Sequence, residues 1–89
     1  MEKPTTNKVL YNKRAWLNKE DSTSTGNVVA MVYKDEDDII TACLSIADCY
    51  NSARLHKTRE DEMVDFIDKM KTLNTEITLF INYLENEHV

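Results

Sequence analysis

The sequence predicts an α+β fold in which a four-stranded antiparallel sheet, a meander, is followed by one long C-terminal amphipathic helix. The helix is indicated by apolar residues spaced three and four positions apart between Thr58 and His88. The sheet is indicated by short alternating or β-rich stretches that polar breaks separate. With 89 residues there is room for one domain. We place this domain at residues 13–89, after a flexible segment at 1–12.

Two hairpins account for the predicted strands. Lys13–Lys19 alternates, with small or apolar residues on one side, Ala15 and Leu17, and larger residues on the other, Arg14, Trp16 and Asn18. The polar stretch EDSTSTGN at 20–27 follows as a turn, and the β-rich run at 27–33 pairs back on the first strand. A second polar break, KDEDD, occupies 34–38.

Residues 39–50 fit two periods, and the fold depends on which one is adopted. As a strand, the stretch has Ile40, Ala42, Leu44 and Ile46 on one side. A turn at 50–53 and a fourth strand at 54–57 then complete the sheet. As a helix, the stretch leads to the alternative fold, a β-hairpin plus a two-helix hairpin.

The C-terminal helix is expected to run from Arg59 to Glu87 behind an N-cap at Thr58, which gives a length of roughly 43 Å. That is longer than one face of so small a domain, so the excess indicates a homo-oligomer, a dimer or higher. Leu79 and Tyr83 point away from the main apolar stripe, and Asn74 lies at its margin, where an amide fixes register between paired helices. The expected oligomer interface comprises Phe66, Met70, Leu73, Asn74, Ile77, Leu79, Phe80, Tyr83 and Leu84.

The formal net charge of −5 is distributed unevenly. Residues 1–34 carry six basic and three acidic residues, a balance of +3, whereas residues 35–89 carry five basic and thirteen acidic residues, a balance of −8. This asymmetry permits an anion-binding surface on an acidic protein. Alternatively, the basic strands pair with the acidic helix of a neighbouring chain.

The composition also limits the expected cellular location of the protein and the cofactors that it is expected to bind. The sequence has no apolar run long enough to cross a bilayer, and its polar start differs from a signal segment, so we expect no membrane association and a cytoplasmic protein, in the host cytoplasm if it is viral. Cys43 and Cys49 lack metal-binding spacing and are interpreted as reduced packing residues. We expect no metal and no cofactor.

A basic and aromatic cluster is the main candidate for ligand binding. Trp16 lies among Lys13, Arg14 and Lys19, and an exposed aromatic residue among cations suits stacking on unpaired bases. The hydroxyl-rich loop, the EDSTSTGN stretch at 20–27, has Gly26 available for a positive φ and is a weaker candidate for holding a phosphate. The candidate ligand-binding residues are Lys13, Arg14, Trp16, Asn18, Lys19, Ser24, Thr25, Gly26, Arg54 and His56. The competing interpretation is that Trp16 packs beneath the helix as a core residue.

No combination of residues points to catalysis. His56 has no identifiable nucleophile or carboxylate partner in the sequence, and the acidic runs at 35–38 and 60–62 are interpreted as a solvated turn and a helix start. We therefore expect a binding protein rather than an enzyme.

The layout resembles a known class of DNA-binding proteins. The segment Ala53–Thr58 (ARLHKT) leads into a helix with Met63, Phe66 and Met70, and four strands precede it. This pattern, over residues 13–88, resembles the ββββα transcriptional-coactivator class of single-strand DNA binders. That resemblance implies dimerisation through the helix and binding through basic and aromatic sheet residues. The acidic C-terminal half departs from the usual basic balance of the class.

Two hypotheses about function follow. The first is a non-catalytic oligomer whose sheet face binds single-stranded nucleic acid or a phosphate-bearing nucleotide, with Lys13, Arg14 and Lys19 neutralising phosphates and Trp16 stacking. The second starts from the small size and the richness in Asn, Lys, Asp and Glu, which are similar to those of phage accessory proteins. It predicts an inhibitor whose acidic surface binds a host or defence protein, or a protein that sequesters a nucleotide signal.

Overall fold

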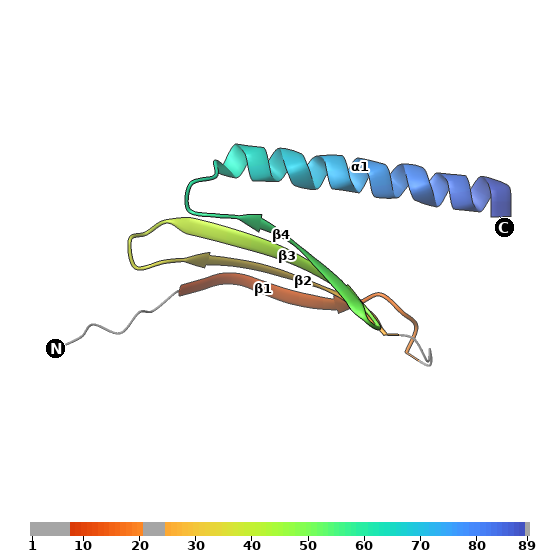
Figure 1. Cartoon of the computed structure of the whole chain (residues 1–89), viewed down its shortest axis with the longest axis horizontal. Helices are drawn as coiled ribbons and strands as arrows, with labels where there is room; N and C mark the ends of the chain where they lie inside the picture. Colours follow the sequence, from red (N-terminus) through yellow and green to blue (C-terminus); the bar gives the residue numbers. More distant parts are fainter. Residues whose placement is uncertain (1–7, 21–24, 89) are drawn as a thin grey trace.

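The computed structural model describes residues 8–20 and 25–88, and it has the predicted α+β arrangement (Figure 1). Four strands form one antiparallel sheet in chain order, and a single helix follows them. The elements are β1 (Lys8–Trp16), β2 (Gly26–Lys34), β3 (Ile40–Asp48), β4 (Asn51–Lys57) and α1 (Met63–His88). The ambiguous stretch is therefore a strand, and the alternative with a two-helix hairpin is wrong.

Strand β1 begins earlier than the sequence analysis predicted. It starts at Lys8, which pairs with Lys34, and it contains a register shift between Val9 and Tyr11. The β-formers before Lys13 extend the strand rather than fraying, because the full length of β2 is available as a pairing partner. The predicted flexible segment at 1–12 therefore ends in a strand, and its residues 1–7 lie outside the described residues.

The turn between β2 and β3 is closed by Asp35. Its carboxylate accepts hydrogen bonds from the backbone N–H groups of Asp37 (2.9 Å) and Ile39 (3.0 Å). Asp38 takes a positive φ of 62°, as the last residue of a three-residue hairpin loop commonly does. The hydrogen bond from Ile39 is the main reason why the pKa of Asp35 lies below its ordinary value.

Helix α1 begins at Met63, four residues after the expected start at Arg59. Thr58 is not its N-cap, because Asp61 draws it into a separate turn. The Asp61 carboxylate accepts hydrogen bonds from the backbone N–H (2.9 Å) and the hydroxyl (3.0 Å) of Thr58. The first hydrogen bonds at the start of the helix run instead to the carbonyl of Glu62. The helix has 26 residues, about 39 Å at 1.5 Å per residue.

Two contacts fix the connection between β4 and α1. Lys57, which is 6% exposed, donates hydrogen bonds from Nζ to the carbonyls of Ile40 (2.7 Å) and Thr58 (3.0 Å). Arg59 bridges to the β2–β3 turn, with ion pairs to Asp35 (3.2 Å) and Asp37 (2.9 Å). The start of the helix is thereby tied to one end of the sheet.

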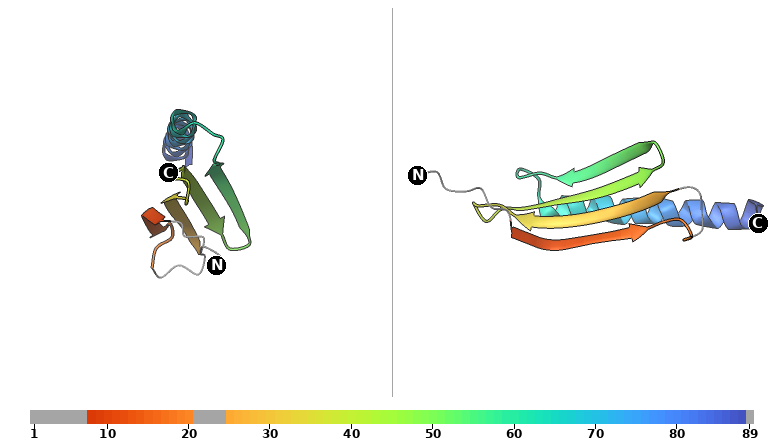
Figure 2. Two further views of the ribbon diagram at one scale, coloured as in Figure 1. Left: turned by 90° about the vertical axis from the view of Figure 1, so that its left-hand side faces the viewer. Right: turned by 90° about the horizontal axis from the view of Figure 1, so that it is seen from below.

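The pairing register divides the strand residues between two faces. Residues that pair across strands share a face, and one face, here called the inner face, collects the aliphatic side chains Val28, Ala30, Val32, Ile40, Ala42, Leu44, Ile46, Ala53 and Leu55. Helix α1 lies on one side of the sheet, behind it in the view from below (Figure 2). The burial of Ala42 and Lys57, which pair on the inner face, indicates that the helix covers this face. The opposite face, here called the outer face, is left uncovered by the helix.

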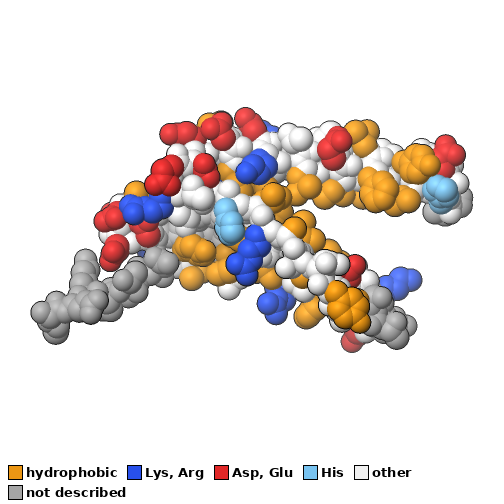
Figure 3. Space-filling model, viewed as in Figure 1, with side chains coloured by type: hydrophobic (Ala, Val, Ile, Leu, Met, Phe, Trp, Pro, Cys, Tyr) orange, Lys and Arg blue, Asp and Glu red, His pale blue; other side chains and the backbone are white. Residues whose placement is uncertain are grey.

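The helix and the inner face diverge instead of closing a core. The two form a wedge with hydrophobic side chains on both walls (Figure 3), and of the four strands α1 closely approaches β4 alone. Among the described residues, Ala42 is the only hydrophobic residue that is buried. The radius of gyration is 16.7 Å, against about 12 Å for a compact chain of this length. We call this space the apolar wedge, with the inner face as one wall and the apolar stripe of α1 from Met63 to Leu84 as the other.

The predicted interface residues differ in burial along the helix. Phe66, Met70 and Leu73 are half-buried near the sheet, whereas the remaining six are exposed, namely Asn74, Ile77, Leu79, Phe80, Tyr83 and Leu84. The half that extends away from β4 thus carries the unpartnered apolar surface. Within the described part of the chain, no helix combines the length and hydrophobicity needed to cross a membrane.

Candidate nucleic-acid interface

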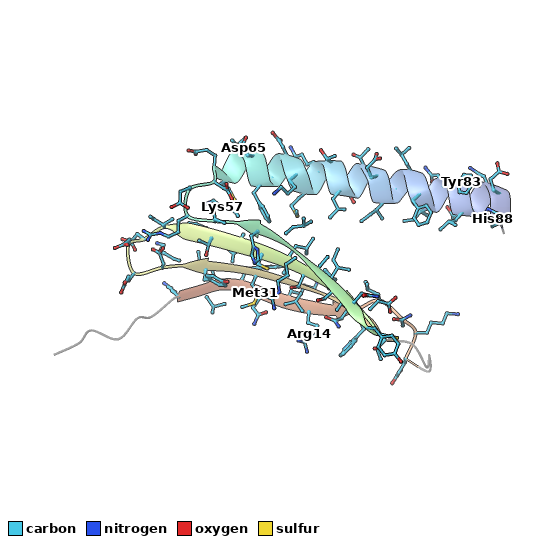
Figure 4. All side chains as sticks on the ribbon, viewed as in Figure 1. Arg14, Met31, Lys57, Asp65, Tyr83 and His88 are labelled. Atoms are coloured by element: carbon cyan, nitrogen blue, oxygen red, sulfur yellow. The ribbon has the colours of Figure 1, made fainter. Side chains whose placement is uncertain are left out.

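The outer face of the sheet brings together basic and aromatic residues from both edge strands. Arg14 on β1 pairs with Val29, which pairs with Ser45, which in turn pairs with Arg54 on β4. The two arginines therefore lie in one row across the sheet, about 14 Å apart at the usual spacing between strands. Figure 4 shows Arg14 and Met31 on the side of the sheet away from α1.

Trp16 occupies the next row of the same face, and its side chain is available to solvent. It is 65% exposed, and the guanidinium carbon of Arg14 lies 5.9 Å from the centroid of its ring. At this distance the cation is attracted to the ring face. The competing interpretation, in which Trp16 packs beneath the helix, is wrong, because the register places Trp16 on the face that the helix leaves free.

The charge of the sheet differs from that of the whole chain. The strands contain six basic residues, three in β1, one in β2 and two in β4, against one acidic residue, Asp48 at the end of β3. Among the described strand residues, the outer face has no Asp or Glu. A polyanion approaching this face meets Arg14 and Arg54 without a carboxylate between them, although the chain has a net charge of −5.

His56 lies at the β4 edge, in the same row as Met31 and Asn12. It also lines a shallow, open hollow together with residues from the start of the helix, namely Asp61, Asp65, Phe66 and Lys69. The hollow is too small and too exposed to enclose a nucleotide. His56 therefore lies at the rim of the outer face rather than at its centre.

Three other predicted residues lie away from the outer face. Lys13 pairs with Ala30 and belongs to the inner side of β1. Asn18 packs against Gly26, since a Cβ atom added to that glycine would lie 2.8 Å from Asn18 Oδ1. Lys19 is exposed in the segment after β1. Alternation along the sequence groups Asn18 with Arg14 and Trp16, but β1 ends at Trp16 and the alternation does not continue.

The hydroxyl-rich loop offers less than its composition indicated. Gly26 is the first residue of β2, is buried and has no positive φ. Its carbonyl already accepts a hydrogen bond from the backbone N–H of Leu17 (2.8 Å). Thr25 is exposed, and its carbonyl lies 3.8 Å from the Cys49 thiol. Ser24 lies outside the described residues, so the loop's phosphate-binding role stays a prediction.

The outer face also contains residues that the sequence analysis did not include among the candidates. Asn12, Met31 and Tyr33 share it with Arg14. Their position depends on the register between β1 and β2 and on the irregularity near Leu10, neither of which the sequence reveals. Once the strand start at Lys8 is known, alternation alone identifies Asn12 as a neighbour of Arg14.

Carboxylates gather at the end of the molecule where α1 begins. The ion pairs of Arg59 join the Asp35–Asp38 turn to the segment that contains Glu60 and Glu62, and this end is dominated by acidic side chains (Figure 3). In residues 8–20 and 25–88, no group of three or more His, Cys, Asp or Glu side chains is arranged to hold a metal ion. The acidic end and the basic outer face are thus separate surfaces.

Comparisons with protein-family models, with curated proteins and with solved structures found no match to this chain.

Proposed function

We propose that this chain is a non-catalytic, oligomeric binding protein whose outer sheet face binds single-stranded nucleic acid. The observation that carries the proposal is the exposed pair of Arg14 and Trp16 on a face without carboxylates, with Arg54 in the same row as Arg14. An unpaired base stacks on the Trp16 ring, and the two arginines neutralise flanking phosphates.

The dimensions of the face suit a short stretch of a single strand. The edge strands β1 and β4, which carry the two arginines, lie about 14 Å apart. Four-stranded sheets with exposed aromatic residues typically stack two or three bases. Between the edges lie small or apolar side chains, Val29, Met31, Cys43 and Ala47, which do not obstruct a base. A duplex offers no unpaired base to Trp16, so the proposal predicts a preference for single strands.

The test is fluorescence anisotropy with a labelled twelve-nucleotide single strand, its duplex and a mononucleotide. The proposal predicts saturable binding of the single strand that weakens steeply as salt rises, with a logarithmic slope of about −0.7 per phosphate contacted. Weaker binding of the duplex is expected. Binding of the mononucleotide alone indicates a nucleotide ligand, whereas equal affinity for single strand and duplex contradicts the stacking proposal.

A second candidate function uses the acidic end. The carboxylates of the Asp35–Asp38 turn and of Glu60 and Glu62 form a surface that suits a basic site on a partner protein, such as a host or defence factor. If the single strand does not bind at 20 mM salt, this candidate is favoured. Charge-reversed variants at Glu36 and Glu60, both exposed, then serve to test binding to a candidate partner.

A further inference from the structure

The apolar wedge requires an occupant. Apart from Ala42, the described hydrophobic side chains are half-buried or exposed, so both walls of the wedge keep much of their apolar surface in contact with water. Exposed apolar patches of this extent are uncommon on stable monomers and mark a surface that another element covers. The identity of that element is indicated by α1 itself.

The C-terminal third of α1 is apolar on two opposite sides. Ile77, Phe80, Ile81 and Leu84 continue the stripe that faces the wedge, while Leu79 and Tyr83 point to the other side of the helix. Leu79 is 57% exposed and Tyr83 is 56% exposed. A helix segment with apolar residues on opposite sides is normally enclosed on both, and the chain's own sheet is able to cover only one of them.

We propose that the wedge of each chain is filled by the C-terminal third of α1, Ile77–Leu84, from a second copy, and that the insertion is reciprocal. This inference deepens the oligomer part of the proposed function and does not depend on the ligand. A segment that is apolar on two sides fits a space with two apolar walls, because one side meets the partner's inner face and the other meets the partner's helix. The two helices then form one antiparallel layer between two sheets.

Charge complementarity supports the same pairing. From Thr72 to Glu87 the helix has three carboxylates, Glu76, Glu85 and Glu87, and no lysine or arginine. The inner side of the sheet carries Lys13 on β1 and Lys34 on β2, against one carboxylate, Asp48 at the end of β3. Within the described residues the ion pairs of the chain are those of Arg59 with Asp35 and Asp37, so these lysines and glutamates are free to pair between copies.

The available area is sufficient for a stable dimer. The six apolar residues between Ile77 and Leu84 expose between 39% and 61% of their surface, together roughly 600 Å² at about 200 Å² for a large side chain. The inner face and the first half of α1 add to this. A typical stable interface buries about 800 Å² on each partner. In a reciprocal insertion, each copy buries its own helix segment and also the walls of its own wedge. Because the exchange is reciprocal, it closes as a two-fold dimer and does not propagate.

The arrangement has a consequence for ligand binding. The helices lie between the inner faces, so the two outer faces point to opposite sides of the dimer. Each dimer then presents Arg14 and Trp16 twice, and a strand long enough to pass around the particle engages both copies.

The first test is the mass in solution by size-exclusion chromatography with light scattering, without nucleic acid. Twice the chain mass of 10.4 kDa, 20.8 kDa, is expected for the unaltered protein. The double substitution Leu79→Glu and Tyr83→Glu places carboxylates on the side that only a partner covers, and we expect at least a hundred-fold weaker association. The matched control is Val64→Glu, which is similarly exposed, at 62%, but lies outside the wedge-facing stripe and should remain a dimer. A monomer of the unaltered chain at 100 μM overturns the proposal.

The second test identifies the occupant directly. In an equal mixture of ¹³C-labelled and unlabelled protein, isotope-filtered nuclear Overhauser spectra report only contacts between copies. We expect contacts from Leu79 and Tyr83 of one copy to Val28 and Ile46 of the other. A dimer whose contacts between copies exclude the inner face contradicts the insertion, whether or not the protein binds oligonucleotides.

Discussion

The guanidinium carbon of Arg14 lies 5.9 Å from the ring centroid of Trp16, on a sheet face that α1 does not cover. In the free protein this pair shields part of the tryptophan ring at the surface. Replacing the guanidinium contact by a stacked base costs little, because the cation stays close enough to bind the neighbouring phosphate. The contact between Arg14 and Trp16 therefore connects the outer face of the sheet with the binding of a base and its phosphate, as proposed above.

Trp16→Ala should weaken binding of a single-stranded oligonucleotide by roughly 5- to 150-fold, since stacking of one base on an aromatic residue contributes about 1–3 kcal/mol. Trp16→Phe should recover most of the loss. The measurement is anisotropy at fixed salt. If Trp16→Ala binds as tightly as the unaltered protein, the ring takes no part in recognition.

Arg14→Ala should reduce the magnitude of the salt slope by about 0.7, the value for one phosphate contact on a single strand. Lys71→Ala is the control, because Lys71 is an exposed residue of α1 and lies away from the outer face. It removes the same charge and should leave the slope nearly unchanged. Equal changes for the two variants would show that overall charge, rather than the outer face, drives binding.

Lys57→Met should destabilise the fold by about 1–3 kcal/mol, because the ammonium donates to two carbonyls, those of Ile40 and Thr58, and the variant leaves both without this donor. Urea unfolding followed by circular dichroism gives the change. Lys71→Met, at an exposed helix position, is the control and should change stability little. A similar loss in both variants would mean that the hydrogen bonds of Lys57 contribute no specific stability.

Stability should fall in acid through two aspartates. Hydrogen bonds from Ile39 to Asp35 and from Thr58 to Asp61 hold the pKa of each carboxyl below its ordinary value of 3.8. A lowered pKa in the folded state contributes stability above pH 3.8, and this contribution is lost as the pH falls through the lowered value.

The double substitution Asp35→Asn and Asp61→Asn should therefore reduce the loss of stability between pH 5 and pH 2.5, measured by urea unfolding. Asp68→Asn, at an exposed position in α1, serves as the control. The interpretation is contradicted if the double variant loses as much stability in acid as the unaltered chain.

The fold followed from patterns that are local in sequence. Alternation identified the hairpins, and the spacing of Met63, Phe66, Met70 and Leu73 identified the helix. Residues 39–50 remained ambiguous because the stretch satisfies both periods. Pairing with β2 along its whole length decides the matter, and such pairing is a tertiary property.

The candidate site was predicted less completely. Composition predicts Arg14 and Trp16 as candidates, but their position on the free face depends on which side of the sheet the helix covers. Asn18 was misplaced because β1 ends two residues before it. The N-cap at Thr58 was wrong because the Thr58 amide and hydroxyl both donate to the Asp61 carboxylate in a separate turn, a contact that a local propensity does not anticipate.

The most direct test of the account is the emission of Trp16, the single tryptophan of the chain, during titration with a single-stranded oligonucleotide at 20 mM salt. Stacking of a base on the ring should quench the emission saturably and should reverse when salt is raised to 500 mM. The result that contradicts the account is an emission spectrum that stays unchanged while the strand is added in large excess.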